Sequence, residues 1–221
     1  MDFATARRMM VDGQVRTSDV TDPGLIAAMA EIPREKFVPA AKSDLAYLDL
    51  DVPVSDGDAR KSRRLLKPMV LAKLIQAGEI EPGDNVLDVA CATGYSSAVL
   101  ARLAASVVAL EEDPALARTA EQVLTALGVK NVSVVTAPLV DGAAERGPYD
   151  VILLNGMSEI LPEILCHQLK DGGRLVGVFN DGSTPRAMVY LSEREEVSGR
   201  AIFDAGAPLL PGFVRPPAFV F

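Results

Sequence analysis

Three small residues in one short stretch would let a ligand approach the backbone. Ala90, Ala92 and Gly94 follow the apolar run Asn85–Val89 and precede a helix-forming segment. Small side chains at a strand-to-helix turn leave room for a bound molecule, and the first turn of the helix offers N–H groups that lack a helical partner. The dinucleotide-binding motif places its third glycine five residues after the first, whereas here the third small residue comes after four. This spacing disfavours a nicotinamide-dependent oxidoreductase; a tight turn without a ligand is the alternative interpretation.

A carboxylate follows the next predicted strand. Glu111 and Glu112 come directly after the run Ser106–Leu110, and Glu111 stands 21 positions after Ala90. A carboxylate at the end of the second strand can accept hydrogen bonds from both hydroxyls of a ribose. Acidic residues often begin loops, so neither feature is specific alone. Together the turn and the carboxylate predict a ribose-bearing ligand.

A basic cluster is a separate feature. Such a cluster could capture an anionic substrate, but nothing in the sequence fixes its geometry, so we interpret it in preference as a solvated loop. Five of the 22 lysines and arginines stand within eight positions: Arg60, Lys61, Arg63, Arg64 and Lys67.

Cysteine and histidine are scarce. Cys91 and Cys166 are the only cysteines, and His167 is the only histidine. A structural zinc site needs about four such ligands, and no Gly-x-Ser-x-Gly motif is present to indicate a histidine-dependent nucleophile. Two cysteines make no disulfide scaffold for a chain of 221 residues, which favours a reducing, cytoplasmic location. We predict no metal, assign no catalytic residue and interpret His167 as structural.

Composition disfavours two further classes of partner. Lys+Arg 22 against Asp+Glu 30 gives a net charge of −8, whereas binding to the phosphate backbone of a nucleic acid needs a basic face. The longest unbroken apolar run has six residues, 25–30, and a membrane span needs about 20. We therefore expect neither a nucleic acid nor a membrane as a partner.

The elements that must position these residues alternate in type. Helical patterns separate the strands, and the clearest begins at Asp113-Pro114 and ends at Gly128. The last two apolar runs, Ala187–Ser192 and Arg200–Asp204, have no useful helix between them and indicate a hairpin. This order predicts an α/β fold, a mostly parallel seven-stranded sheet with a C-terminal antiparallel hairpin. The runs typical of buried parallel strands are Asn85–Val89, Ser106–Leu110, Asn131–Val135, Tyr149–Leu154 and Arg174–Phe179.

The first third of the chain predicts helices and a loop. Asp22-Pro23 begins a helix that ends before Pro33, and Pro68 begins another that runs to Ala77. We interpret the polar stretch 54–67 as a loop and residues 208–217 as an extended closing segment. The chain therefore divides into an N-terminal helical cap with a substrate-side loop, residues 1–67, and a sheet domain, residues 68–221, packed as one unit.

Several longer stretches carry a specific resemblance. The most diagnostic is Pro33-Arg34-Glu35-Lys36-Phe37-Val38-Pro39, within residues 27–39. With it, the chain resembles the protein-L-isoaspartate (D-aspartate) O-methyltransferase family over most of its length. The turn at residues 90–94 also resembles the G-x-G-x-G loop of S-adenosylmethionine-dependent methyltransferases. The other stretches that carry the likeness are residues 46–49, 82–88, 93–101, 127–132, 148–152 and 168–176.

The resemblance implies a Rossmann-like S-adenosylmethionine-dependent methyltransferase fold and a reaction. Such enzymes transfer a methyl group from S-adenosyl-L-methionine to the α-carboxylate of isoaspartyl residues in damaged proteins, so isoaspartyl proteins or peptides are the expected partners. A carboxylate of pKa about 4 is already ionised at neutral pH, and the reaction needs no general base. The cofactor-binding residues expected by this resemblance are Asp88, Ala90, Cys91, Ala92, Gly94, Tyr95, Glu111, Glu112, Pro138, Leu139 and Asn155.

The chain departs from the family's pattern at three places. Ala90 and Ala92 replace cofactor-site glycines, and residues 137–139 replace a Gly-Asp-Gly element whose acid faces the adenine. The family's G-x-G-Q-T-I-S-x-P segment is longer here, and Leu66 aligns with its catalytic serine. Ser62 could take that place only in a refolded loop. We therefore expect weak or absent isoaspartyl methylation even where the cofactor binds.

Three functions remain open at this point. The first is an S-adenosylmethionine-dependent protein carboxyl O-methyltransferase of the isoaspartyl-repair type. The alternative is a family member with weakened or lost isoaspartyl activity that acts on another substrate or binds a nucleoside or a protein, because a fold can outlive its activity. The third is a nicotinamide-dependent oxidoreductase, which the turn spacing disfavours.

Overall fold

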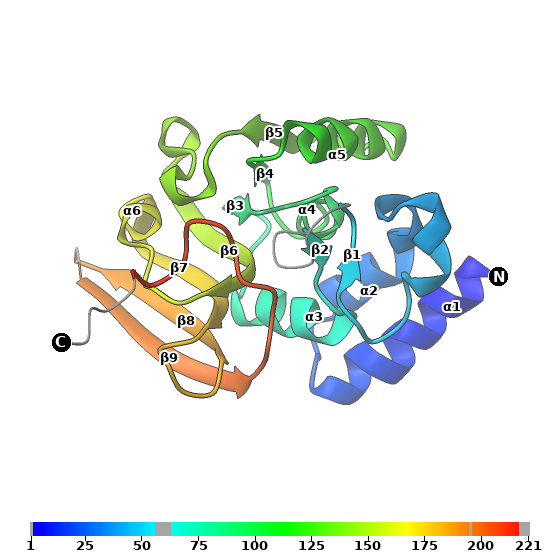
Figure 1. Ribbon diagram of the computed structural model, residues 1–221, viewed down its shortest axis with the longest axis horizontal. Coiled ribbons are helices and arrows are strands. Elements are labelled where there is room, and N and C mark those ends of the chain that lie inside the picture. The colour runs from blue at the N-terminus through cyan, green and yellow to red at the C-terminus, as the bar shows by residue number, and fades with distance from the viewer. Residues whose placement is uncertain (1, 56–62, 195, 217–221) are drawn as a thin grey trace.

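A twisted sheet runs through the middle of the molecule (Figure 1). The computed structural model describes residues 2–55, 63–194 and 196–216, and within them seven strands pair in the order β5-β4-β3-β6-β7-β8-β9. Neighbours from β5 to β7 are parallel, whereas β8 and β9 are antiparallel to their neighbours. The predicted mostly parallel sheet with a terminal hairpin is confirmed, and β3 pairs with β4.

The strands match the predicted apolar runs in position but not always in length. β6 (Tyr149–Ser158) continues beyond the predicted end at Leu154, and β7 (Leu169–Phe179) begins before the predicted start at Arg174. The apolar run ends at Leu154, but Met157 pairs with Val178 of β7, so strand pairing extends β6. The other strands of the sheet are β3 (Asn85–Val89), β4 (Ser106–Glu111), β5 (Val132–Thr136), β8 (Arg186–Glu193) and β9 (Glu196–Asp204).

Buried residues cover both faces of the sheet, because successive side chains of a strand point to opposite sides. Val86 of β3 belongs to a cluster that includes residues of the N-terminal helices and of α3, α4 and α5. Its neighbour Leu87 belongs to a second cluster, with residues of α6, η5 and the C-terminal segment. The helices are α3 (Pro68–Ala77), α4 (Tyr95–Leu100), α5 (Pro114–Ala126) and α6 (Glu163–Cys166), with the 3-10 turns η5 (Leu139–Asp141) and η6 (Ala144–Arg146).

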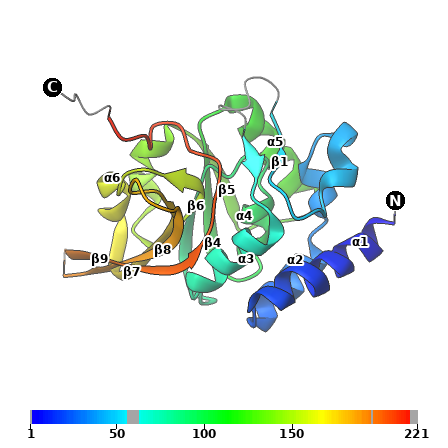
Figure 2. The same ribbon diagram turned by 60° about the horizontal axis from the view of Figure 1, so that its bottom comes forward.

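The N-terminal helices lie at one end of the molecule and the β8–β9 hairpin at the other (Figures 1 and 2). The helix predicted to begin at Asp22-Pro23 is α2 (Pro23–Glu31), and the Asp22 carboxylate accepts a hydrogen bond from Leu25 N at 2.7 Å. This N-cap and the Pro at the first helical position explain where the helix begins. The remaining elements here are α1 (Phe3–Met10), the π-helical turn η1 (Val11–Val15) and the 3-10 turns η2 (Arg16–Ser18), η3 (Arg34–Phe37) and η4 (Ala40–Leu45).

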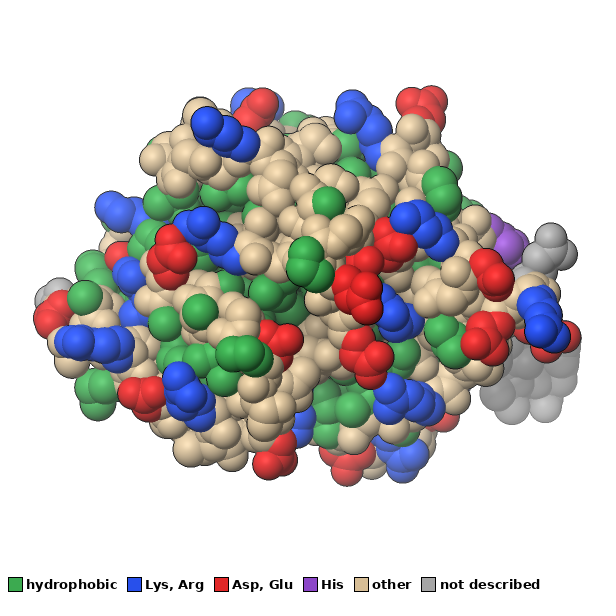
Figure 3. Space-filling view, turned by 180° about the vertical axis from the view of Figure 1, so that it is seen from behind, with side chains coloured by type: hydrophobic (Ala, Val, Ile, Leu, Met, Phe, Trp, Pro, Cys, Tyr) green, Lys and Arg blue, Asp and Glu red, His purple; other side chains and the backbone are tan. Residues whose placement is uncertain are grey.

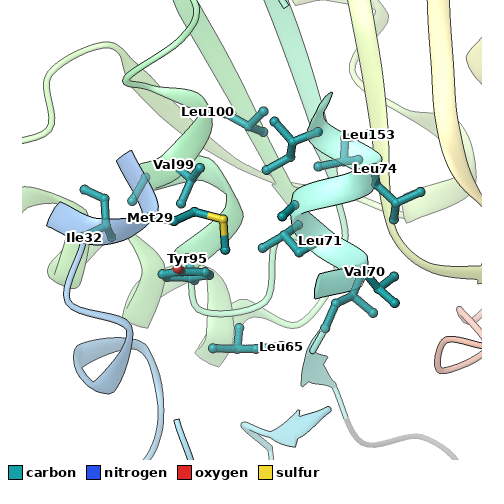
Figure 4. Close-up of a cluster of buried hydrophobic side chains, with 14 of the residues drawn as sticks. Met29, Ile32, Leu65, Val70, Leu71, Leu74, Tyr95, Val99, Leu100 and Leu153 are labelled. Carbon is teal, nitrogen blue, oxygen red and sulfur yellow. The ribbon is translucent and has the colours of Figure 1, made fainter. Parts of the chain in front are cut away.

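One methionine joins three helices of the first cluster. Figure 4 shows Met29 of α2 pointing between Val99 of α4 and Leu71 of α3. In the same view Leu65 lies beside Tyr95, which begins α4. The cap and the sheet therefore share one continuous core rather than meeting across a polar boundary.

Part of the predicted loop 54–67 is instead a short hairpin. β1 (Val52–Pro53) pairs antiparallel with β2 (Arg64–Leu65), and Val54 N donates to Arg63 O at 2.9 Å. Strands of two residues leave no periodic pattern in a sequence, so the prediction of a loop was wrong for this part. Val52 and Leu65 are buried in the first cluster, and this burial fixes the hairpin against the rest of the fold.

The surface mixes charges of both signs. In Figure 3 acidic and basic side chains are interspersed among hydrophobic ones over one face of the molecule. Within the described ranges, no helix is long and apolar enough to cross a membrane. At the C-terminal end, Leu209 forms a parallel bridge with Met157 of β6, and a turn at residues 211–212 interrupts the segment that was predicted to be extended.

Candidate functional site

Predicted site residues from three strands meet at the carboxyl ends of those strands. The chain passes from β3 outward to β4 and β5 and returns on the other side of β3 as β6, so the strand order reverses between β3 and β6. In open α/β sheets, ligands bind in the crevice at such a reversal. Asp88 lies near the end of β3, Glu111 ends β4, and Asn155 lies in β6. The fold thus gathers residues that are far apart in the sequence.

The loop between β3 and α4 has a backbone conformation that favours glycine. The φ angle is 61° at Ala90, 54° at Ala92 and 90° at Gly94. This left-handed conformation costs an alanine on the order of 1–2 kcal/mol. At Gly94 space is also tight, because a Cβ would lie 3.2 Å from the Cβ of Ala120 in α5. The two alanines therefore keep a turn that glycine would form with less strain.

The carboxylate of Glu111 is fully buried and surrounded by donors. The backbone N–H groups of Ala92, Glu112 and Asp113 donate to it at 2.9, 3.0 and 3.1 Å. Arg63 Nε lies 3.1 and 3.2 Å from its two oxygens, and Arg63 Nη2 donates to Glu112 Oε1 at 2.9 Å. The carboxylate that the sequence predicts as a ribose acceptor is thus paired with an arginine of the same chain.

This ion pair corrects the interpretation of the basic cluster as solvated. The Arg63 side chain is only 9% exposed. Arg64 and Lys67 are half-buried, so they too depart from a freely solvated loop. No local pattern indicates that Arg63 is buried, because its partner Glu111 lies 48 positions further along the chain. Three residues discussed above lie outside the described residues: Arg60, Lys61 and Ser62.

A buried polar network lies directly behind the loop. The carboxylate of Asp88 accepts hydrogen bonds from Ser96 Oγ at 2.7 Å, from Ser97 Oγ and from Asn155 Nδ2. Burial raises the pKa of Asp88 to about 6, although the three hydrogen bonds oppose that rise. The network joins β3, α4 and β6, and it fixes Asn155 at the reversal of strand order.

Arg34 is a buried charged residue, and no pattern in the sequence indicates its burial. Its Nε donates to Ala46 O and its Nη2 to Leu66 O, both at 2.7 Å. The guanidinium carbon lies 4.6 Å from the centre of the Tyr95 ring. Burial lowers the pKa of Arg34, and the neighbouring Tyr95 opposes that shift. Arg34 therefore holds the backbone of Leu66 next to the site.

The space in front of the loop is almost filled by the chain itself. A cavity of about 10 Å³ remains between the segment Arg64–Leu66 and the loop residues Ala90–Ala92. Leu66 is 2% exposed, and Cys91 is buried, which raises the pKa of its thiol. Such a volume holds about one water molecule. The hairpin end is therefore the immediate neighbour of the loop.

The remaining predicted residues lie at the edge of this site or away from it. Leu139 is buried in the same cluster as Ala90, whereas Pro138 is exposed just after β5. His167 is exposed at the end of α6, and Cys166 is a free thiol. Across the ranges that the structure describes, no group of three or more His, Cys, Asp or Glu side chains could hold a metal ion.

A family model matches residues 6–200. Its description is protein-L-isoaspartate(D-aspartate) O-methyltransferase. The protein-L-isoaspartate O-methyltransferase of Koribacter versatilis is 39% identical over 174 residues, which are 79% of this chain and 76% of that protein. The protein-L-isoaspartate O-methyltransferase 1 of Rhodopseudomonas palustris is 38% identical over 190 residues, 86% of this chain and 76% of that protein.

Solved structures agree with the sequence relatives. A protein-L-isoaspartate O-methyltransferase superposes with a TM-score of 0.81 at 25% identity, covering 93% of this chain; this chain spans 66% of that one. A putative member from Plasmodium falciparum, in complex with S-adenosyl-L-homocysteine, superposes with a TM-score of 0.77 at 18% identity, covering 92% of this chain and 97% of the other. The second likeness concerns the fold alone.

Proposed function

The chain belongs to the protein-L-isoaspartate(D-aspartate) O-methyltransferase family, and from this premise we propose that it is an S-adenosylmethionine-dependent protein carboxyl methyltransferase. Its substrate is the carboxylate of isoaspartyl residues in damaged proteins or peptides. The observation that carries this function is the family match over residues 6–200, together with relatives of that activity at 38–39% identity.

The donor set at the carboxyl ends of β3, β4 and β6 suits this cofactor. Glu111 is the proposed acceptor for the two ribose hydroxyls, because a carboxylate at the end of the second strand can bind both. The loop Ala90–Gly94 is proposed to bring backbone atoms close to the methionine part. When bound, S-adenosyl-L-methionine supplies a methyl group on a positively charged sulfur. The volume left by residues 64–66 is too small for it in the present conformation.

Further proposed contacts lie around these two. Glu112 stands beside Glu111, and Asp88 and Asn155 fix the floor of the site through their mutual hydrogen bond. Cys91 and Tyr95 are proposed to line it. Pro138 and Leu139, which follow β5, are proposed for the adenine side; they provide no acid there, so recognition of the adenine rests on shape and on backbone groups.

The chemistry asks little of the side chains. The substrate carboxylate is ionised at neutral pH, since its pKa is about 4, and it needs no general base. The protein's contribution is to hold the carboxylate in line with the methyl group and to exclude water. Leu65 and Leu66 offer an apolar wall for the second task. Leu66 has no hydroxyl to donate to the carboxylate, which makes the transfer slow.

The same proposal places the protein in the cytoplasm. Cys91 and Cys166 are both free thiols, as expected for a chain in a reducing compartment. Isoaspartyl-containing proteins, formed wherever proteins age, are its proposed partners.

Isothermal titration of the full chain tests the cofactor directly. We expect S-adenosylhomocysteine to bind with one site per chain and NAD not to bind, because the turn and its spacing suit the former. Binding of NAD in place of S-adenosylhomocysteine would contradict the proposed function.

A further inference from the structure

The acidic end of the site already has an occupant from the chain. Arg63 donates through Nε to both oxygens of Glu111 and through Nη2 to Glu112. The side chains of Arg63 and Glu111 are 9% and 0% exposed, so both charges are almost fully removed from water. Charge-assisted hydrogen bonds in such surroundings are the strong ones. A ribose hydroxyl, which is neutral, must replace a cation to reach the same oxygens.

The residues that follow Arg63 fill the neighbouring part of the site. Arg64, Leu65 and Leu66 line the cavity in front of the loop, and only about 10 Å³ is left there. Ligand sites for molecules of cofactor size measure about 300–1,000 Å³. The acidic end and the apolar part are thus blocked by one continuous segment.

Hydrogen bonds to its backbone groups hold this segment, residues 63–67, in place. Arg63 N donates to Ser55 Oγ at 2.9 Å, and Arg63 O accepts from Val54 N at 2.9 Å. Further on, Leu66 O accepts from Arg34, and Lys67 N donates to Asp51 Oδ1 at 2.8 Å. Arg63 therefore projects from an anchored strand end toward Glu111, which makes its contact a defined one.

We propose that Arg63 is an intramolecular competitor of the cofactor's ribose for Glu111, so that residues 63–66 hold the enzyme in an autoinhibited form. The inference rests on the proposed function, since it assumes that a ribose-bearing cofactor uses Glu111. The cofactor binds after Arg63 has left the carboxylate, and its apparent affinity is lowered by the small fraction of molecules in which this has happened.

Removal of the competitor leaves the acidic end intact. In Arg63→Ala, Glu111 keeps the three backbone donors of Ala92, Glu112 and Asp113. The buried carboxylate therefore stays hydrogen-bonded, and the variant is expected to fold. Its carboxylate is available to the ribose without prior loss of an ion pair. Because the variant has no Arg63–Glu111 ion pair to break, it should bind the cofactor more tightly than the wild type.

Titration of the full chain with S-adenosylhomocysteine tests the proposal. We expect Arg63→Ala to bind about 10- to 100-fold more tightly than the wild type, the range that charge-assisted hydrogen bonds support. Arg118→Ala is the matched control, because Arg118 is an exposed cation on α5, the helix after Glu111. It should bind as the wild type does. Arg63→Lys keeps the charge but not the forked geometry, so its affinity should lie between those of the wild type and Arg63→Ala.

A double-variant comparison separates competition from a general loosening of the hairpin. In the Glu111→Ala background, Arg63→Ala should give no gain in affinity, because the shared carboxylate is absent. In the Arg63→Ala background, Glu111→Ala should weaken binding about 10- to 100-fold. If Arg63→Ala acted by loosening the hairpin, it would raise affinity in the Glu111→Ala background as well as in the wild type, and that result would overturn the proposal.

The outcomes also distinguish failure of this proposal from failure of the proposed function on which it rests. Equal or weaker binding by Arg63→Ala, with clear binding by the wild type, overturns the competition and leaves the cofactor assignment standing. No binding by any variant, Arg63→Ala included, overturns both. Thermal melting shows whether each variant is folded. If Arg63→Ala does not fold, the same titration is done with Arg63→Gln, which keeps more of the side chain.

Discussion

Two buried carboxylates on neighbouring strands have different partners. Glu111, at the end of β4, faces a cation and three backbone donors. Asp88 accepts hydrogen bonds from neutral side chains, two serines and an asparagine; burial and the nearby charge of Glu111 raise its pKa to about 6. The first is paired with a charged side chain, whereas the second ties β3, α4 and β6 together. Residue type alone does not separate these roles; the partners do.

The raised pKa of Asp88 predicts a pH-dependent loss of stability. The folded protein holds this proton more tightly than an unfolded chain, whose Asp has a pKa of 3.8. The contribution to the free energy of unfolding is therefore fully present below pH 4 and is lost as the pH rises through about 6. A rise of about two units corresponds to about 3 kcal/mol.

Urea unfolding of the wild type and of Asp88→Asn between pH 4 and pH 7 checks this. The asparagine cannot ionise, so the wild type should lose about 3 kcal/mol relative to the variant over this range. A difference between the two proteins that is constant with pH would show that Asp88 does not titrate in this window.

At the scale of elements, the cap is held to the sheet by apolar packing around α2. Met29 is fully buried between α3 and α4 (Figure 4), and Thr93 of the loop between β3 and α4 donates to Phe37 O of the cap at 2.5 Å. The loop that begins α4 is thus supported from the cap as well as from the sheet. Loss of this packing would loosen the site as well as the fold.

Truncation of Met29 tests the importance of that packing. Met29→Ala should lower the free energy of unfolding by about 2–5 kcal/mol, as expected for a buried large-to-small change. Met9→Ala, on α1 where the side chain is 68% exposed, should change it by less than about 0.5 kcal/mol. Denaturant titration gives both numbers; comparable losses in the two variants would contradict the role of α2.

Elements with a local signal could be predicted, and those that depend on distant partners could not. The capped helix α2 and the buried strand β3 agree with the sequence patterns, because a cap and an apolar run act over a few residues. The hairpin β1–β2 has strands of two residues, and pairing across the intervening stretch leaves no such pattern. The same holds for the site: the turn and Glu111 were predicted, whereas the burial of Arg63 and Arg34 depends on tertiary contacts.

For the molecule as a whole, three parts of the chain converge on one site. The sheet supplies Asp88, Glu111 and Asn155, the cap supplies Arg34, and the hairpin supplies Arg63 and Leu66. The family fold is retained over most of the chain. The reaction is that of the family.

The most direct test is methyl transfer to a pair of peptides. The full chain is incubated with S-adenosyl-L-methionine labelled in its methyl group and with peptides of one sequence that contain either an isoaspartyl or an ordinary aspartyl residue. We predict slow labelling of the isoaspartyl peptide as an alkali-labile ester and none of the aspartyl peptide. Equal labelling of both peptides, or no labelling of the isoaspartyl peptide by a chain that binds S-adenosylhomocysteine, would contradict the proposed function.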